Sequence, residues 1–239
     1  MAEQDFLGVW RVWLTAGIPF GLGTEITIDS QNGVLSVTTE PEVGEGLQIT
    51  YWESDDQMRI TGLPMTPELV LAHYRDPDPT IDYRALYGAA LMEATDLKQS
   101  RLALCYADHV ADTTTSTSGE RQAPTNPWGN DQIWKVQASS GSQFGIGSTV
   151  TLGEGNSVLS ISNVFGEAIP PVPTMQYVAE SGALRGELPA NEHPRIVVQC
   201  SIADFDGDQR IFGVGVIGDP EASGVWGGDE EDPPQGEDR

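Results

Sequence analysis

The chain has 239 residues, of which 36 are acidic and only 12 are Lys or Arg, so its formal net charge is −24. Such an excess of carboxylates repels phosphate groups, which excludes nucleic-acid binding through a basic face and disfavours binding to anionic membranes. No apolar run approaches the length of a membrane-spanning helix, and the first residues lack the features of a signal peptide, so we expect a cytoplasmic protein.

Short segments with alternating apolar and polar side chains run through the first hundred residues, a pattern typical of half-buried β-strands. Asn32-Gly33 predicts a tight hairpin between two of them, because both residues tolerate positive φ. No segment shows the periodicity of an amphipathic helix. We predict about eight strands, at Leu7–Trp13, Glu25–Asp29, Val34–Thr38, Leu47–Trp52, Gln57–Thr61, Glu68–Tyr74, Arg84–Met92 and Arg101–Tyr106.

The chain also contains an internal repeat. Residues 10–38 align without gaps on residues 134–162, with 11 of 29 positions identical, so we expect two homologous all-β halves. The segment between the halves is rich in Thr, Ser and Pro, which is a linker composition. We predict a first β-barrel repeat at 5–110, a linker at 111–128, a second β-barrel repeat at 129–218 and an acidic disordered tail at 219–239.

Positions that are apolar in both copies lie two residues apart within each strand, so they share one face, which we expect to form the interior. They are Trp10/Trp134, Val12/Val136, Ile26/Val150, Ile28/Leu152, Leu35/Leu159, Val37/Ile161, Leu69/Ile196 and Leu71/Val198. Eight strands that close into a barrel enclose either a packed core or one small ligand. In this alignment His73 corresponds to Cys200, and Tyr74 corresponds to Ser201.

The segment Gly8-Val9-Trp10 resembles the start of the first strand in lipocalins and the wider calycin group, and Arg101–Tyr106 resembles the final strand of small lipocalin-like domains. The resemblance implies two tandem, antiparallel lipocalin-like β-barrels. It also implies that a basic residue near the last strand, Arg101 or Lys98, covers Trp10. Members of this group mostly bind small hydrophobic molecules inside the barrel, and some relatives cyclise or isomerise natural products.

Several residues are candidates for chemistry. His73 shares the parity of the inward residues, so it is either a general base facing a ligand or a hydrogen-bonded core histidine. The segment Asp204–Asp208 is read as a turn, with a weak cation site as the alternative, because it lacks the Gly and Glu of a calcium loop. Cys105 and Cys200 are expected to be buried thiols.

We expect a protein that binds a small, largely apolar molecule in a barrel interior, as a monomer or small homo-oligomer without cofactor or metal. The candidate ligand-binding residues are Trp13, Trp52, Arg59, His73, Tyr74 and Tyr87, and His73 is the candidate catalytic residue. Two alternatives remain open. One is a barrel enzyme, a cyclase or isomerase that uses cavity shape and one acid or base. The other is an acidic structural or interaction protein with solid cores.

Overall fold

The structure is a computed structural model, and it describes residues 2–17, 20–92, 101–113, 126–129, 132–141, 144–152, 159–162, 175–188, 196–217 and 219–231. The first half opens with a short helix and continues as eight strands. These are α1 (Ala2–Phe6), β1 (Gly8–Ala16), β2 (Glu25–Gln31), β3 (Val34–Glu40), β4 (Gln48–Trp52), β5 (Gln57–Leu63), β6 (Thr66–Arg75), β7 (Arg84–Met92) and β8 (Arg101–Ala111). All eight predicted strands of this half are therefore present.

The second half repeats the same succession of strands. They are β9 (Ile133–Ser140), β10 (Thr149–Leu152), β11 (Leu159–Ser162), β12 (Met175–Val178), β13 (Ala183–Leu188), β14 (Ile196–Phe205), β15 (Asp208–Ile217) and β16 (Asp219–Glu231). The described part of the chain is thus all-β apart from α1, as the alternating patterns predict.

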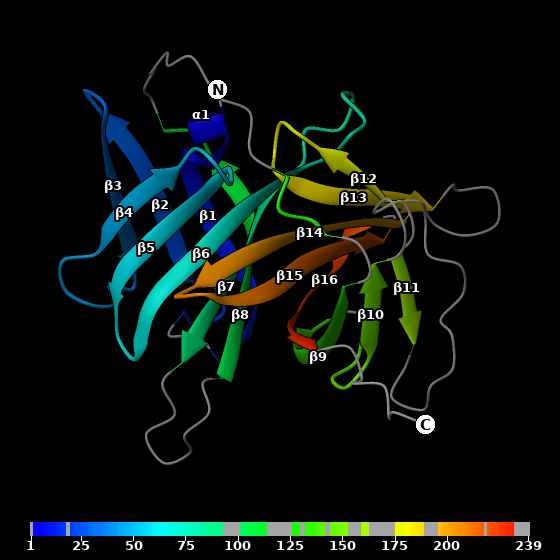
Figure 1. Cartoon of the computed structure of the whole chain (residues 1–239). Helices are drawn as coiled ribbons and strands as arrows, with labels where there is room; N and C mark the ends of the chain where they lie inside the picture. The colour runs from blue at the N-terminus through cyan, green and yellow to red at the C-terminus, as the bar shows by residue number, and fades with distance from the viewer. Residues whose placement is uncertain are drawn as a thin grey trace, which may run out of the picture.

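Each half forms one antiparallel, eight-stranded sheet with the same order of strands (Figure 1). In the first half the order is β3-β2-β1-β8-β7-β6-β5-β4, and in the second it is β11-β10-β9-β16-β15-β14-β13-β12. The first strand of each half pairs with the last, so the sheet curls round on itself. The first sheet is a nearly closed barrel, and the second is a half-barrel.

Equivalent glycines shape both halves in the same way. Gly23 and Gly147 have φ of 82° and 86°, and their amides donate to the carbonyls of the equivalent residues Val12 and Val136, each over 2.8 Å. Residues with positive φ need glycine unless strain is tolerated, which explains why these glycines recur at the same spacing. The predicted hairpin at Asn32-Gly33 is confirmed, with both residues at positive φ.

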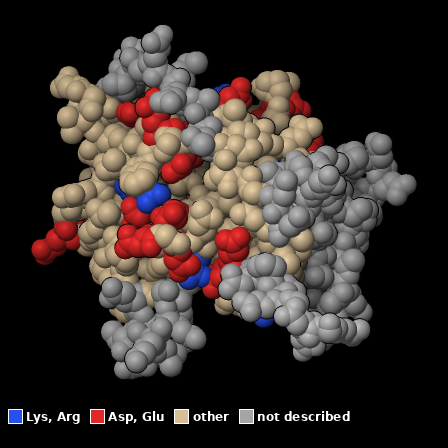
Figure 2. All heavy atoms as spheres, viewed as in Figure 1, with Lys and Arg blue, Asp and Glu red and all other residues tan. Residues whose placement is uncertain are grey.

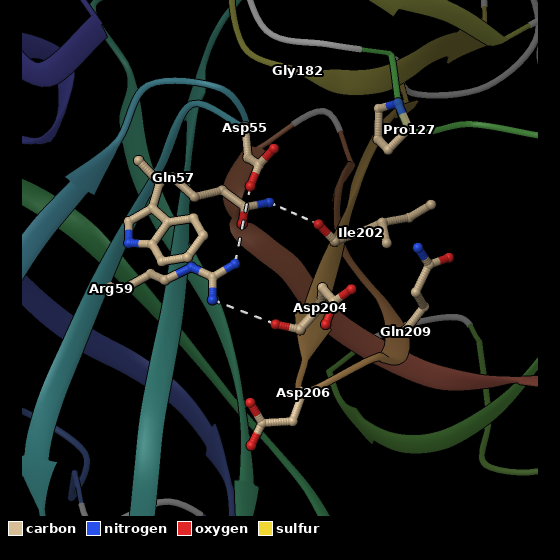
Figure 3. A pocket seen from close by; sticks show the side chains of 10 residues that line it. Asp55, Gln57, Arg59, Pro127, Gly182, Ile202, Asp204, Asp206 and Gln209 are labelled. Carbon is tan, nitrogen blue, oxygen red and sulfur yellow. Dashed lines mark hydrogen bonds and ion pairs between the residues drawn. The ribbon is translucent and has the colours of Figure 1, made fainter.

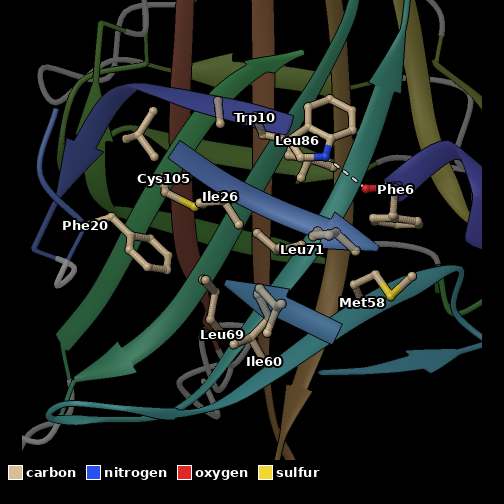
Figure 4. Packing of buried hydrophobic residues seen from close by; sticks show 14 of the residues in the cluster. Phe6, Trp10, Phe20, Ile26, Met58, Ile60, Leu69, Leu71, Leu86 and Cys105 are labelled. Carbon is tan, nitrogen blue, oxygen red and sulfur yellow. Dashed lines mark hydrogen bonds between the residues drawn. The ribbon is translucent and has the colours of Figure 1, made fainter. Parts of the chain in front are cut away.

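The predicted inward faces form two separate cores. Trp10, Val12, Ile26, Ile28, Val37, Leu69 and Leu71 are buried together in the first half, and Trp134, Val136, Val150, Leu152 and Val198 in the second. Leu35 packs against the first core, whereas the side chains of Leu159, Ile161 and Ile196 lie outside the described part of the structure. Figure 4 shows the side chains of the first core converging from opposite walls of the barrel.

α1 covers one end of the first barrel. Its last residue, Phe6, is fully buried in the first core, and the Phe6 carbonyl accepts a 2.9 Å hydrogen bond from the Trp10 indole nitrogen. Trp10 is also covered by a basic residue, but that residue is His109, whose ring lies 4.9 Å from the indole. Arg101 stands at the opposite end of β8, since it pairs with Met92 while His109 pairs with Trp10, and Lys98 lies outside the described residues.

A third apolar cluster joins the two halves. It consists of outward-facing residues of β6, β7 and β8 packed against outward-facing residues of β9, β14, β15 and β16, and Tyr87 and Phe212 belong to it. Their rings lie 5.5 Å apart. Burying aromatic side chains of this size contributes strongly to stability, so the halves are held together by a core of their own.

The strand pairing corrects the alignment of β6 with β14. In the repeat alignment of β7 with β15, Gly88 is equivalent to Gly213. Within its own sheet Gly88 pairs with Leu71, and Gly213 pairs with Cys200. Leu71 is therefore equivalent to Cys200 and not to Val198. By the same register, His73 corresponds to Ile202 and Tyr74 to Ala203, two residues further along than the sequence alignment had placed them.

With this register, contacts across the junction become reciprocal. The Arg59 guanidinium donates to the carbonyl of Asp204 over 3.4 Å, and the equivalent Arg185 donates to the carbonyl of Arg75 over 3.1 Å. Arg75 and Asp204 are themselves equivalent. The two halves thus pack through the same face, as the subunits of a two-fold symmetric dimer do.

The predicted C-terminal limit of the second repeat is wrong. We expected residues 219–239 to be a disordered tail, but Asp219–Glu231 forms β16, which pairs with both β15 and β9. Composition misled the prediction: Gly and acidic residues dominate this segment, yet Val225 and Trp226 are fully buried. Residues 232–239 lie outside the described part.

Candidate functional site

A pocket of about 410 Å³ lies at the junction of the two halves. We call it the junction pocket; its lining residues are Trp52, Asp55, Gln57, Arg59, Pro127, Gly182, Ile202, Asp204, Asp206 and Gln209. Figure 3 shows residues at the start of β5 on one side facing residues at the end of β14 and the start of β15 on the other. Each half supplies one wall, so the site exists only where the two are packed together.

Arg59 lies beneath Trp52 in the wall of the pocket that the first half contributes. Its side chain is only 7% exposed, and the guanidinium carbon lies 3.7 Å from the centroid of the Trp52 ring. The guanidinium donates to Glu68 over 3.0 Å and lies 4.0 Å from Asp55. A stacked and doubly paired arginine is held in one conformation, which makes it a rigid support for Trp52.

Substitutions between the repeats make the two equivalent corners of the junction different. At the opposite side of the junction the equivalent Arg185 lies over Tyr74, 5.4 Å from the ring centroid. The residue equivalent to Tyr74 is Ala203, which has no ring for Arg59 to stack on and is buried in the cluster between the halves. Trp52 in turn corresponds to Val178, by the pairing of each with the strand that follows. The two equivalent corners have therefore diverged: in one the arginine lies over a tyrosine of the other half, and in the other it lies over a tryptophan of its own half.

Two buried polar atoms at the junction pocket have no hydrogen-bond partner within the described part of the chain. They are Oε1 of Gln57, whose side chain is 3% exposed, and Nε of Arg59. The amide nitrogen of Gln57 is satisfied, because it donates to the carbonyl of Ile202 over 2.8 Å. A buried acceptor without a donor costs free energy, and such atoms often mark where a ligand or water binds.

The charge of the pocket is negative. Asp55, Asp204 and Asp206 line it, and Arg59 is the one cationic side chain among the lining residues, already paired with carboxylates. Acidic side chains also gather where the halves meet on the face shown in Figure 2 and surround the few cationic ones there. The pocket therefore lies in a negative electrostatic field.

The predicted ligand-binding residues are distributed over four places, and His73 occupies the fourth, inside the first barrel. Trp52 and Arg59 line the junction pocket together. Tyr74 and Tyr87 face outward from the first barrel and lie in the core between the halves, where burial raises the pKa of Tyr87 well above its usual range. Trp13 is 55% exposed on β1 and does not line the pocket.

His73 points into the first barrel, as its parity predicts. Its ring lies 5.1 Å from that of Phe6, and its Nε2 lies 3.2 Å from Oδ2 of Asp56, which is fully buried. The Tyr51 hydroxyl donates to the other oxygen of Asp56 over 2.6 Å. The structure thus places a buried carboxylate beside His73, as expected for a hydrogen-bonded core histidine. The three side chains form a hydrogen-bonded cluster beneath α1.

Sequence reasoning missed most of the junction pocket. Asp55 and Gln57 lie at a β-hairpin, Asp204 lies near the end of β14, and Asp206, at φ 55°, lies in the turn that joins β14 to β15. The turn reading is confirmed, but these carboxylates also form a wall. The only signal was the replacement of Tyr74 and of Trp52 between repeats, and that signal needs the correct register to be recognised.

Both cysteines are free and fully buried. Cys105 belongs to the first core and Cys200 to the second, and burial raises the pKa of Cys105 to about 12. They are inert at neutral pH, since the thiolate is the reactive form. Within the described ranges, no three His, Cys, Asp or Glu side chains are grouped closely enough to hold a metal ion.

No family model matches the sequence, and no curated protein is significantly similar to it. What the structure supports of the resemblance to lipocalins is the barrel architecture. Among the described residues, no helix has both the length and the apolar character needed to cross a bilayer.

Proposed function

We propose that the protein binds a small polar organic molecule in the junction pocket. The observation that carries the proposal is the open crevice itself, which is walled by Trp52 on rigid Arg59 and contains buried polar atoms that lack partners. Its volume of about 410 Å³ falls within the range of small-molecule sites. An exposed aromatic face beside hydrogen-bonding groups is the usual combination in such sites.

The site is proposed at the junction and not inside a barrel because of how the first barrel is filled. Its interior holds large, fully buried side chains, including Phe6, Trp10, Phe20 and Met58. A ligand entering there would have to displace side chains packed at the density of a protein core. The junction pocket requires no such displacement.

The proposal is tested by a thermal-shift screen of small polar compounds on the full chain. A ligand present at 100 times its Kd stabilises the folded state by about 2.7 kcal/mol, which shifts the unfolding temperature measurably. We expect compounds whose shift is lost in Trp52→Ala and retained in Trp13→Ala. The second variant is the matched control, because it removes an equally large exposed indole away from the pocket.

A shift that survives Trp52→Ala unchanged would place the ligand elsewhere and overturn the proposal. So would a screen in which no compound stabilises the wild-type chain.

A further inference from the structure

We infer that the ligand of the junction pocket is an organic cation with a flat apolar portion, such as an aryl amidine or aryl amine. This inference rests on the proposed function and adds the chemical class of the ligand. It is argued from the charges of the pocket wall, from the unpartnered oxygen of Gln57 and from the exposed ring of Trp52.

The wall of the junction pocket carries more negative than positive charge. The pocket is lined by the carboxylates of Asp55, Asp204 and Asp206, and the Arg59 guanidinium is engaged by Asp55 and by Glu68. Neither wall contributes a lysine or a second arginine within the described residues. An anionic ligand would meet uncompensated repulsion here, whereas a cation would be attracted from solution and held.

The Gln57 side chain favours a hydrogen-bond donor in the ligand, independently of the acidic residues. Oε1 of Gln57 is buried, lacks a donor within the described part of the chain, and belongs to a side chain that lines the pocket. The amide is fixed, because its nitrogen donates to the Ile202 carbonyl. An oxygen held in this way needs an N–H or O–H donor, and amidinium and ammonium groups supply several donors together with the favourable charge.

The exposed ring of Trp52 offers the ligand an apolar contact. One face of the Trp52 ring is covered by Arg59, yet the side chain remains 43% exposed, so indole surface is left for a ligand. A flat ring stacked on this indole surface would remove apolar area from contact with water, while the cationic end of the ligand reached the carboxylates. A metal ion fits less well, because no three metal-binding side chains cluster in the described ranges.

The experiment compares three probes that share one ring and differ in charge: benzamidine, benzamide and benzoate. Each is titrated into the full chain at low ionic strength by calorimetry, with Trp52→Ala as the site control. We expect benzamidine to bind at least tenfold more tightly than benzamide, and benzoate to give no measurable binding. Benzamidine affinity should fall as salt is added, since salt screens exposed charges.

Charge-neutralising variants locate the effect. Asp204→Asn combined with Asp206→Asn should weaken benzamidine binding by about three- to tenfold, because each exposed carboxylate contributes a modest attraction. Asparagine preserves the hydrogen bond that Asp204 accepts from the Gly207 amide, so the turn is kept. Glu45→Gln, an exposed charge removed from a loop residue that does not line the pocket, should leave affinity unchanged.

The outcomes separate the two proposals. If benzamide or benzoate binds as tightly as benzamidine and Trp52→Ala abolishes that binding, the pocket is a ligand site but the cationic class is wrong. If benzamidine binds equally well to Trp52→Ala, or if none of the three probes binds, the inference is overturned. The screen described above then decides on its own whether the junction pocket holds any ligand.

Discussion

Trp52 illustrates how much the neighbours of a single residue determine its role. It stands at the end of a strand, stacks on a buried arginine and faces an open crevice, whereas Trp13 is also exposed, at 55% against 43% for Trp52, but has no such surroundings. Residue type and exposure alone do not distinguish the two. What distinguishes Trp52 is the Arg59 guanidinium beneath its ring and the junction pocket beside it.

His109 gives a residue-scale prediction on pH. Its pKa is lowered in the folded chain, first by burial against the protein and then by the nearby Arg84 guanidinium. The unfolded chain therefore takes up a proton at this site before the folded chain does, and stability falls as pH drops through the unfolded value of about 6.5. We expect His109→Gln to make the decline in unfolding free energy between about pH 7.5 and 5.5 shallower.

Urea titrations at the two pH values measure that slope, and comparing slopes removes any constant cost of altering the contact with Trp10. An identical slope in wild type and variant would show that His109 makes no difference to the proton balance.

At the scale of elements, β16 is the strand that completes the second sheet. It lies between β9 and β15, so without it the first three strands of that half, β9, β10 and β11, lose their connection to the rest of the sheet. We expect deletion of residues 219–239 to destabilise the second half by several kcal/mol, since it removes a central strand and the buried side chains of Val225 and Trp226. Deletion of residues 232–239 leaves β16 intact and is the matched control.

Circular dichroism and calorimetry of the two deletions would show the difference. Equal unfolding temperatures would mean that β16 adds nothing to the stability of the sheet.

The strands show what could be predicted from the sequence and what could not. Alternation in β1 to β8 and the repeat identified the strands and the inward residues, because one-sided burial imposes a period of two. β16 escaped prediction because its fold depends on burial by β9 and β15, which composition does not record. The register of β6 against β14 was wrong by two residues, an error that keeps the face unchanged and so leaves no trace in the hydrophobic pattern.

The candidate site was predicted less well than the fold, for a physical reason. Trp52 and Arg59 line the junction pocket and not a barrel interior, and Tyr87, expected in a barrel interior, lies between the barrels. Both sides of β7 are apolar, so parity does not say which face meets the other half. The wall formed by Asp204 and Asp206 arises only when the halves dock.

At the scale of the whole molecule, the shared core between the halves predicts that they unfold together. Tyr87 is fully buried there, contacts Phe212, and bonds with Ser201 and Gln199 over 3.0 Å each. Tyr87→Ala should cost about 3–5 kcal/mol, as for other large aromatic truncations, and should split one calorimetric transition into two. A single transition at an unchanged temperature would mean that the halves are not coupled through this face.

The replacement of tyrosine by alanine at one of two matching positions has a wider consequence. Each half contributes the same positions to the junction, and because the halves pack through the same face, each corner is built from residues of both repeats. A mutation in one copy then affects the two corners differently. In one corner it changes the half that supplies the arginine, and in the other it changes the half that faces the arginine. Divergence between the two repeats therefore makes the two corners chemically different without any change in the way the halves pack.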